Sequence, residues 1–283
     1  MNVETYLRRI AYSGPLQPTL ETLRALHYAH LLAVPFENLD IHCAVPIVLD
    51  EERFFDKIVT RRRGGFCYEL NGLFAALLRE LGFQVTLLSA RVPKEENVAG
   101  PEFDHLTLRV DLDGPWLADV GFGESFVEPL PLLANAEQFQ RDVFYTVDIY
   151  EDRWRVLRYA REAPNDHGVK VRINNSRWEW RMLYDFTLAP RRLSDFAAMC
   201  HHHQTSPQSH FTRGRLCSQL TPTGRITLTD SRLTITEGSL RREIPITPAA
   251  FETTLEKHFG IRLPLVSLEE QPERRVAHPS RVC

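Results

Sequence analysis

Residues 63–71 read Arg63-Gly64-Gly65-Phe66-Cys67-Tyr68-Glu69-Leu70-Asn71. The paired glycines let the chain turn sharply, because glycine adopts backbone conformations that other residues avoid. Directly after them begins an apolar helix face, which stops at Gly82 and is formed by Leu70, Phe74, Leu77, Leu78 and Leu81. Cys67 therefore lies in the first turn of a predicted helix and shares its inward face.

The position of Cys67 favours a reactive thiol. Unpaired N–H groups and the helix dipole stabilise a thiolate at a helix start, which predicts a pKa below the ordinary value of about 8.5. An inward-facing thiol there is a candidate nucleophile. Most free cysteines are instead small buried hydrophobes. We assign that role to the cysteines that follow no paired glycines at a helix start, which are Cys43, Cys200, Cys217 and Cys283.

The sequence around this motif divides into three regions. Up to Gly82 the apolar spacing is helical, and a helix capped by Asp50 is expected to end at Gly64-Gly65. The apolar period then changes to two, at residues 85–92, 105–112, 143–150 and 154–160. The last third mixes a helical start near Leu193, two short strands and a helix over residues 248–258. The pattern predicts a helical region over residues 1–84, a β-rich region over 85–190 and an α/β region over 191–283, packed as one unit.

A cysteine nucleophile needs a base, and the base needs a group that orients it. His105 begins a predicted strand, and Asp119 follows on the next one. A two-residue turn at Asp113-Gly114 would send Asp119 to the opposite face of the sheet. A three-residue loop, Leu112-Asp113-Gly114, with Gly114 at positive φ, instead sets Asp119 opposite Thr107 and diagonal to His105. The alternative is a surface hairpin in which Asp119 merely precedes a glycine turn.

The other histidines fit less specific roles. His27 and His30 lie in an amphipathic helix, where local hydrogen bonds account for them. A metal site formed by His201, His202 and His203 with His210 would lack a nearby Cys or carboxylate at ligand spacing. We therefore expect these histidines to lie in a solvated loop.

Composition limits the classes of protein. The chain has 283 residues, 43% of them hydrophobic and 25% charged, which is typical of a folded globular protein. Its net charge of −3 argues against nucleic-acid binding. Because no apolar run reaches the about 18 residues of a spanning helix and no signal peptide is evident, we expect no membrane association and a cytoplasmic location. An odd count of five cysteines is typical of reduced thiols.

Several motifs give the chain a resemblance to the arylamine N-acetyltransferases. They occur in the family's order between positions 35 and 211, and the motif around Cys67 is the most specific. The motifs are Pro35-Phe36-Glu37-Asn38-Leu39, residues 63–71, His105-Leu106, Asp119-Val120-Gly121-Phe122-Gly123 and, more weakly, Thr205-Ser206-Pro207-Gln208-Ser209-His210-Phe211.

The resemblance implies an α+β multidomain fold with a cysteine-protease-like catalytic core. An N-terminal helical bundle (1–84) would carry the nucleophile, a central antiparallel β-barrel-like domain (85–190) the His and Asp, and a C-terminal α/β lid (191–283) would complete the fold. The segment from Asp113 to Asp119 is shorter than is usual in the family, which we expect the turn to absorb. The interdomain insertion typical of eukaryotic members is missing, so the chain is similar to the bacterial ones.

The resemblance also implies chemistry. Acetyl-CoA would be the acetyl donor, aromatic amines or hydrazines the acceptors, and no metal would take part. Cys67 would carry the acetyl group in a ping-pong transfer, with His105 as base and Asp119 as the residue that orients it. The backbone N–H of Cys67 is a natural oxyanion donor.

Further roles follow for residues of the other motifs. An aromatic acceptor pocket is expected from Phe36, Phe66 and Phe122, although core packing explains these three equally well. Contacts with CoA are expected at Ser209 and Gly123, the alternative for Ser209 being a solvated loop residue. Glu37 and Glu69 are expected to pair with Arg8, Arg9 or Arg63.

Two other functions are compatible with the same residues. A cysteine hydrolase would use the same triad and pass the acyl group to water, so that only the access of the acceptor would differ. A catalytically silent binding protein would use the scaffold alone, against which the intact set of Cys67, His105 and Asp119 argues.

Overall fold

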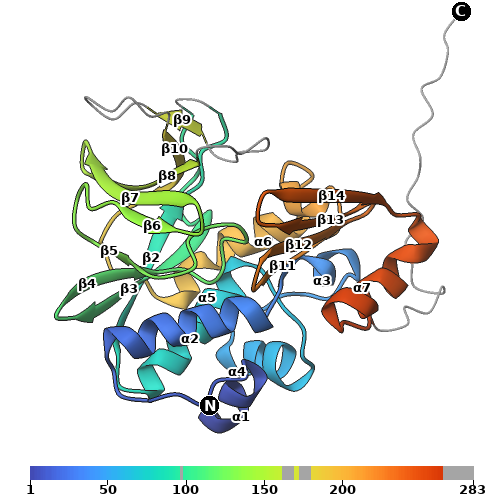
Figure 1. The fold of residues 1–283 in the computed structure, drawn as a ribbon, viewed down its shortest axis with the longest axis horizontal. Helices are drawn as coiled ribbons and strands as arrows, with labels where there is room; N and C mark the ends of the chain where they lie inside the picture. The colour runs from blue at the N-terminus through green and yellow to red at the C-terminus, as the bar shows by residue number, and fades with distance from the viewer. Residues whose placement is uncertain (96–97, 161–168, 172–179, 264–283) are drawn as a thin grey trace, which may run out of the picture.

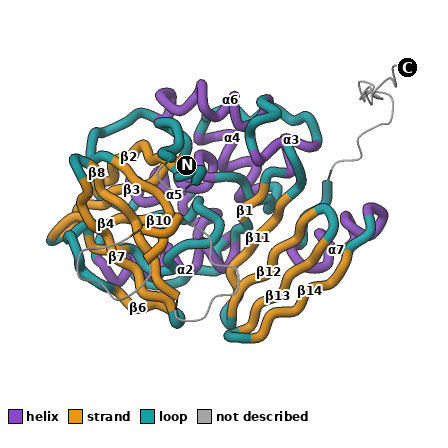
Figure 2. The backbone as a smooth tube through the Cα atoms, turned by 90° about the horizontal axis from the view of Figure 1, so that it is seen from above, coloured by secondary structure: helices purple, strands orange, loops and turns teal. Residues whose placement is uncertain are grey.

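The computed structural model describes residues 1–95, 98–160, 169–171 and 180–263. Two antiparallel sheets lie on either side of a central group of helices (Figure 1, Figure 2). The α+β class implied by the resemblance is confirmed.

The helices fall mainly in the first eighty residues. They are α1 (Val3–Arg9), α2 (Leu20–Ala33), α3 (Leu39–His42), α4 (Glu51–Phe55), the π-helical turn η1 (Asp56–Thr60), α5 (Cys67–Glu80), η2 (Leu193–Phe196), α6 (Ala197–Thr205), η3 (His210–Thr212), η4 (Pro248–Ala250) and α7 (Phe251–Phe259). Asp50 caps α4 as predicted, because its Oδ1 accepts a hydrogen bond from Arg53 N–H at 2.9 Å. The helical turns after Asp50 end at Thr60, earlier than the predicted Gly64.

A nine-stranded sheet forms the middle of the chain. Its strands are β2 (Gln84–Arg91), β3 (His105–Leu112), β4 (Gly114–Ala118), β5 (Leu130–Pro131), β6 (Gln138–Gln140), β7 (Val143–Tyr150), β8 (Arg153–Ala160), β9 (Val169–Val171) and β10 (Trp180–Phe186). The order is β5-β4-β3-β2-β10-β8-β7-β6, with β9 added on β10. β5 also contacts β7, so the sheet curves into a nearly closed barrel (Figure 1).

The second sheet has five strands in the order β1-β11-β12-β13-β14. They are β1 (Phe36–Glu37), β11 (Leu216–Thr221), β12 (Gly224–Thr229), β13 (Arg232–Glu237) and β14 (Leu240–Pro245). β1 pairs with β11, with Phe36 opposite Ser218. The N-terminal region of the chain thus supplies a strand to the C-terminal sheet.

The β3–β4 hairpin has the predicted register. Asp111 pairs with Pro115 across the loop Leu112-Asp113-Gly114, and Gly114 has a φ of +149°. Leu108 pairs with Ala118, so Asp119 lies one step further along, at the level of Thr107.

Helix α5 lies between the two sheets and is buried from Cys67 to Leu78 (Figure 2). The paired glycines before it have a different role from the one expected. Neither has a positive φ, whereas Arg62 does, at +53°. A Cβ on Gly64 would lie 2.0 Å from the Pro35 carbonyl oxygen, and one on Gly65 would lie 2.7 Å from Glu69 Oε2. The glycines therefore allow close packing of this segment against β1 and α5.

None of the helices within the described ranges is both long and apolar enough to cross a membrane.

Candidate active site

His105 and Asp119 form a buried hydrogen bond. His105 Nε2 lies 2.6 Å from Asp119 Oδ2, and the two residues are 3% and 1% exposed. An ionised carboxylate can only accept, so Nε2 carries the hydrogen and Nδ1 is the ring nitrogen left for another partner. The predicted reach between these two side chains is confirmed.

Asp119 is held by more partners than the sequence predicted. Oδ2 also accepts a hydrogen bond from the Tyr184 hydroxyl at 2.8 Å, and Oδ1 accepts from Asn71 Nδ2 at 2.8 Å and from Gly121 N–H at 3.0 Å. Burial alone would raise the pKa of Asp119, but the charge of His105 and these hydrogen bonds outweigh it and lower the pKa. The carboxylate is therefore ionised at neutral pH.

Cys67 is the first residue of α5 and is 3% exposed. One turn later on the helix, Asn71 Nδ2 donates to the Leu106 carbonyl at 2.6 Å, and Asn71 Oδ1 accepts from Val120 N–H at 2.9 Å. A Cβ on Gly121 would lie 2.9 Å from Cys67 Cα. The start of α5 is thus packed against the start of β3 and against the segment that follows β4.

The pKa of Cys67 differs from the expectation. Burial raises the pKa of the thiol well above its ordinary value, and interaction with the Leu106 backbone N–H opposes this only in part. The predicted lowering of the thiol pKa is therefore wrong for proton release to water, because removal of the thiolate from solvent is the largest influence on it.

The three candidate pocket phenylalanines have different surroundings. Phe122 packs edge-on against His105 at a ring distance of 5.2 Å and against Tyr184 at 5.1 Å. Phe36 is 8% exposed and lies against Gly123. Phe66 is fully buried in contact with aromatic neighbours, so core packing accounts for it.

The C-terminal histidines lie in helical turns and not in the expected loop, although His201 and His210 are exposed. His201, His202 and His203 belong to α6, and His203 is buried, with Nε2 3.2 Å from Asp104 Oδ1. Ser209 is also buried, and its hydroxyl lies 3.2 Å from His203 Nδ1. The solvated alternative for Ser209 is therefore wrong, while its contact with CoA stays a prediction.

The helical histidines were also assigned wrongly to local hydrogen bonds. His30 Nδ1 lies 2.7 Å from the Tyr6 hydroxyl, and His27 contacts the backbone of Asp119 and Val127. The partners of both histidines come from other elements, because each side chain points inward from α2.

Glu37 and Glu69 belong to a buried charged cluster. Arg63 binds Glu37 and Asp40 at 2.8 Å each, which confirms Arg63 as a partner of Glu37. Glu69 instead pairs with Lys57 at 2.9 Å, and Lys57 also lies 2.8 Å from Asp40. The predicted Arg8 and Arg9 are not the partners, since Arg8 pairs with Glu4 and Arg9 donates to backbone carbonyls.

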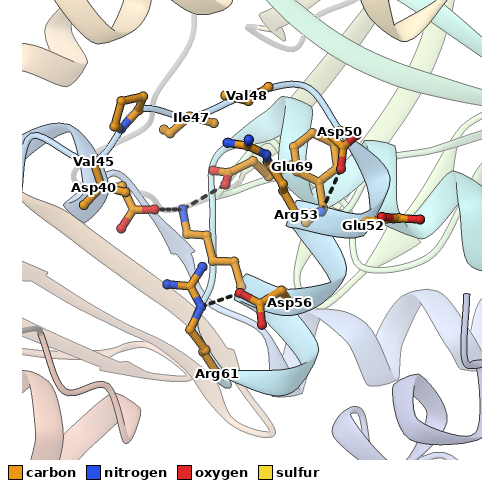
Figure 3. A pocket seen from close by; sticks show the side chains of 13 residues that line it. Asp40, Val45, Ile47, Val48, Asp50, Glu52, Arg53, Asp56, Arg61 and Glu69 are labelled. Atoms are coloured by element: carbon orange, nitrogen blue, oxygen red, sulfur yellow. Dashed lines mark hydrogen bonds and ion pairs between the residues drawn. The ribbon is translucent and has the colours of Figure 1, made fainter.

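A pocket of about 530 Å³ opens beside this cluster (Figure 3). It is lined by Asp40, Lys57 and Glu69 and by more peripheral residues that include Arg61 and Asp56. Cys67, His105 and Asp119 do not line it.

Four of the five cysteines lie within the described residues, and all four are free thiols. Of these, Cys67, Cys200 and Cys217 are buried and Cys43 is half-buried, whereas Cys283 lies outside the described residues. Over the stretches of the chain that the structure describes, no three His, Cys, Asp or Glu side chains are grouped to hold a metal ion.

Comparison with known proteins identifies the family of the chain. A sequence profile described as N-acetyltransferase matches residues 19–267. The chain belongs to the arylamine N-acetyltransferase family. It is 35% identical to the arylamine N-acetyltransferase of Mycolicibacterium smegmatis, covering 93% of each chain, and 35% identical to the pineal gland isozyme NAT-3 of Gallus gallus, covering 93% of this chain and 95% of that one.

Solved arylamine N-acetyltransferases share the fold. The Mycobacterium marinum enzyme in complex with CoA superimposes with a TM-score of 0.80 at 33% identity, over 92% of this chain and 93% of that one.

Proposed function

We propose that this arylamine N-acetyltransferase homologue transfers the acetyl group of acetyl-CoA to aromatic amines and hydrazines through an acetyl-Cys67 intermediate. The observation that carries the proposal is the buried 2.6 Å bond between His105 and Asp119 beside the first turn of α5. The CoA bound to the similar M. marinum enzyme supports the choice of donor.

The first half-reaction loads the enzyme. Cys67 gives its proton to His105 Nδ1, and the thiolate attacks the thioester carbonyl carbon. The developing oxyanion accepts a hydrogen bond from the Cys67 backbone N–H. The carbon–sulfur bond to CoA then breaks, and the CoA thiolate takes the proton from His105.

The second half-reaction transfers the acetyl group from Cys67 to the amine. The amine nitrogen attacks the acetyl carbon, His105 takes the amine proton, and the Cys67 thiolate leaves. Asp119 holds the imidazole with its Nε2–H fixed, so that Nδ1 handles the proton in both halves. Phe122 and Phe36 line the acceptor side, and Gly123 and Ser209 contact CoA.

Intact-mass analysis tests the proposal. Wild-type protein mixed with acetyl-CoA should gain one acetyl group, and an added aromatic amine should remove it and appear acetylated. Cys67→Ala should gain none, whereas Cys200→Ala, which removes an equally buried thiol on α6, should load normally. Loading of a folded Cys67→Ala protein, or loss of the acetyl group to water at the same rate without amine, contradicts the proposal.

A further inference from the structure

His27 joins the two ends of the segment that carries Asp119 and Phe122. It lies on α2, is fully buried, and both ring nitrogens meet main-chain atoms. Nδ1 is 2.9 Å from the Val127 carbonyl oxygen, and Nε2 is 3.1 Å from both the backbone nitrogen and the carbonyl oxygen of Asp119. These partners are the first and last residues of the segment 119–127, which follows β4.

The partners determine the state of the ring. The Val127 carbonyl can only accept, so Nδ1 must carry a hydrogen. Burial lowers the pKa of His27 to about 4, so the ring is neutral at pH 7 and Nε2 is bare. The single N–H of a neutral ring lies on Nδ1, whose partner is the Val127 carbonyl, so Nε2 accepts the Asp119 N–H and gives no hydrogen to the equally close Asp119 carbonyl. The other titratable groups near the ring are the Asp119 carboxylate and His30.

The aromatic neighbours fix the plane of the ring. Phe126 stacks on it at 5.9 Å with an angle of 11°, and Phe74 meets its edge at 6.0 Å. The imidazole therefore has little freedom to tilt away from either main-chain partner.

We infer that His27 is a positioning residue for acyl transfer, which as the neutral Nδ1–H tautomer fixes the main chain of Asp119 so that its carboxylate meets His105. The inference rests on the proposed function. Asn71 from α5 and Tyr184 from β10 hold the carboxylate oxygens of Asp119, and His27 from α2 holds its backbone N–H. Three elements thus determine the direction from which Asp119 approaches His105.

His30 provides a matched control on the same helix. It is also fully buried and meets the edge of Phe74, at 5.4 Å, but its hydrogen bond goes to Tyr6. Replacing His30 removes a buried imidazole from α2 without touching Asp119.

The test compares His27→Asn, His27→Gln and His30→Asn. An asparagine amide reaches the Nδ1 position and keeps the Val127 bond, whereas a glutamine oxygen reaches the Nε2 position and can accept the Asp119 N–H. We expect His27→Asn to slow acetylation of Cys67 by acetyl-CoA about tenfold to hundredfold, the cost of a small misplacement. In His27→Asn, the midpoint of the pH profile for alkylation of Cys67 by iodoacetamide should also shift to higher pH. In His27→Gln, the acetylation rate and the alkylation midpoint should both return to their wild-type values. His30→Asn should lower only the melting temperature.

Three results overturn the inference. The first is a His27→Asn protein whose acetylation rate and alkylation midpoint match the wild type. The second is an acetylation rate that falls equally in His27→Asn and His27→Gln. The third is an acetylation rate that falls as much in His30→Asn as in His27→Asn. Nitrogen-15 NMR of the wild-type protein gives a test that needs no variant, since a charged His27 or an Nε2–H tautomer at pH 7 also overturns it. If the wild-type protein takes no acetyl group from acetyl-CoA, the proposed function fails, but the alkylation and NMR results still decide the role of His27.

Discussion

At the scale of single residues, the proposed mechanism requires the proton of Cys67 to move within the site. Release of this proton to water would leave a buried anion, and burial accordingly raises the pKa of the thiol. Transfer to His105 leaves the net charge of the site unchanged, and the ionised Asp119 stabilises the resulting imidazolium. A reactive Cys67 is therefore expected only while His105 is present.

The pH dependence of alkylation checks this argument. In the wild-type protein, modification of Cys67 by iodoacetamide should already be fast at about pH 6, well below the range of an ordinary thiol. In His105→Gln the thiol has no internal acceptor, so the raised pKa should move the midpoint above about 8.5. A wild-type midpoint near that of a free thiol, or superimposable profiles for the two proteins, would show that no ion pair forms.

At the scale of elements, the predictable features of the site are local ones. Loop length and the period of two determine the register of the β3–β4 hairpin, so the approach of Asp119 to His105 could be predicted. The other groups that hold Asp119 are distant in sequence: Asn71 by 48 positions, Tyr184 by 65 and His27 by 92. Only tertiary packing brings them together, and no local pattern identifies them.

At Gly64-Gly65, too, a local feature could be predicted from the sequence, whereas the tertiary contact could not. The paired glycines predicted a break in the chain before the helix of Cys67, but glycine is needed at position 64 because of the neighbouring Pro35 carbonyl and not because of backbone conformation. Pro35 directly precedes strand β1, and the Glu37 N–H of that strand donates a hydrogen bond to the Gly65 carbonyl at 2.8 Å.

Gly64→Ala should therefore destabilise the protein. The added Cβ would lie 2.0 Å from the Pro35 oxygen, so the segment must shift, at a cost of about 1–3 kcal/mol in the free energy of unfolding. Because α5 starts directly afterwards, acetylation of Cys67 should slow as well. Urea denaturation measures the first effect, with Gly238→Ala as the comparison, where no atom lies within 4 Å and only the φ of +57° is strained. An unchanged denaturation midpoint for Gly64→Ala would refute this packing argument.

At the scale of the whole molecule, a buried charged cluster connects separate elements of the fold. Lys57 from η1 lies between Asp40 of α3 and Glu69 of α5, and Arg63 bridges Asp40 and Glu37 of β1. Figure 3 shows Asp40 and Glu69 facing each other, and the Lys57 ammonium lies between their carboxylates. Arg61 and Asp56 line the same pocket and pair with each other. Since β1 pairs with β11, the cluster also connects the helices to the C-terminal sheet.

Lys57→Met tests this connection against Arg61→Met, which removes a cation from the same pocket. Lys57 is 4% exposed and its loss leaves buried carboxylates unpaired, so the free energy of unfolding should fall by about 3–5 kcal/mol. Arg61 and Asp56 are 52% and 56% exposed, and their pair should contribute at most about 1 kcal/mol.

Burial already raises the pKa of Glu69 despite Lys57, and without that cation the pKa rises further. The folded variant then binds a proton that the unfolded chain does not, so its deficit relative to the wild type should shrink as the pH falls from about 7 to about 5. Equal losses in the two variants, or a deficit that grows on acidification, would mean that Lys57 does not compensate these carboxylates.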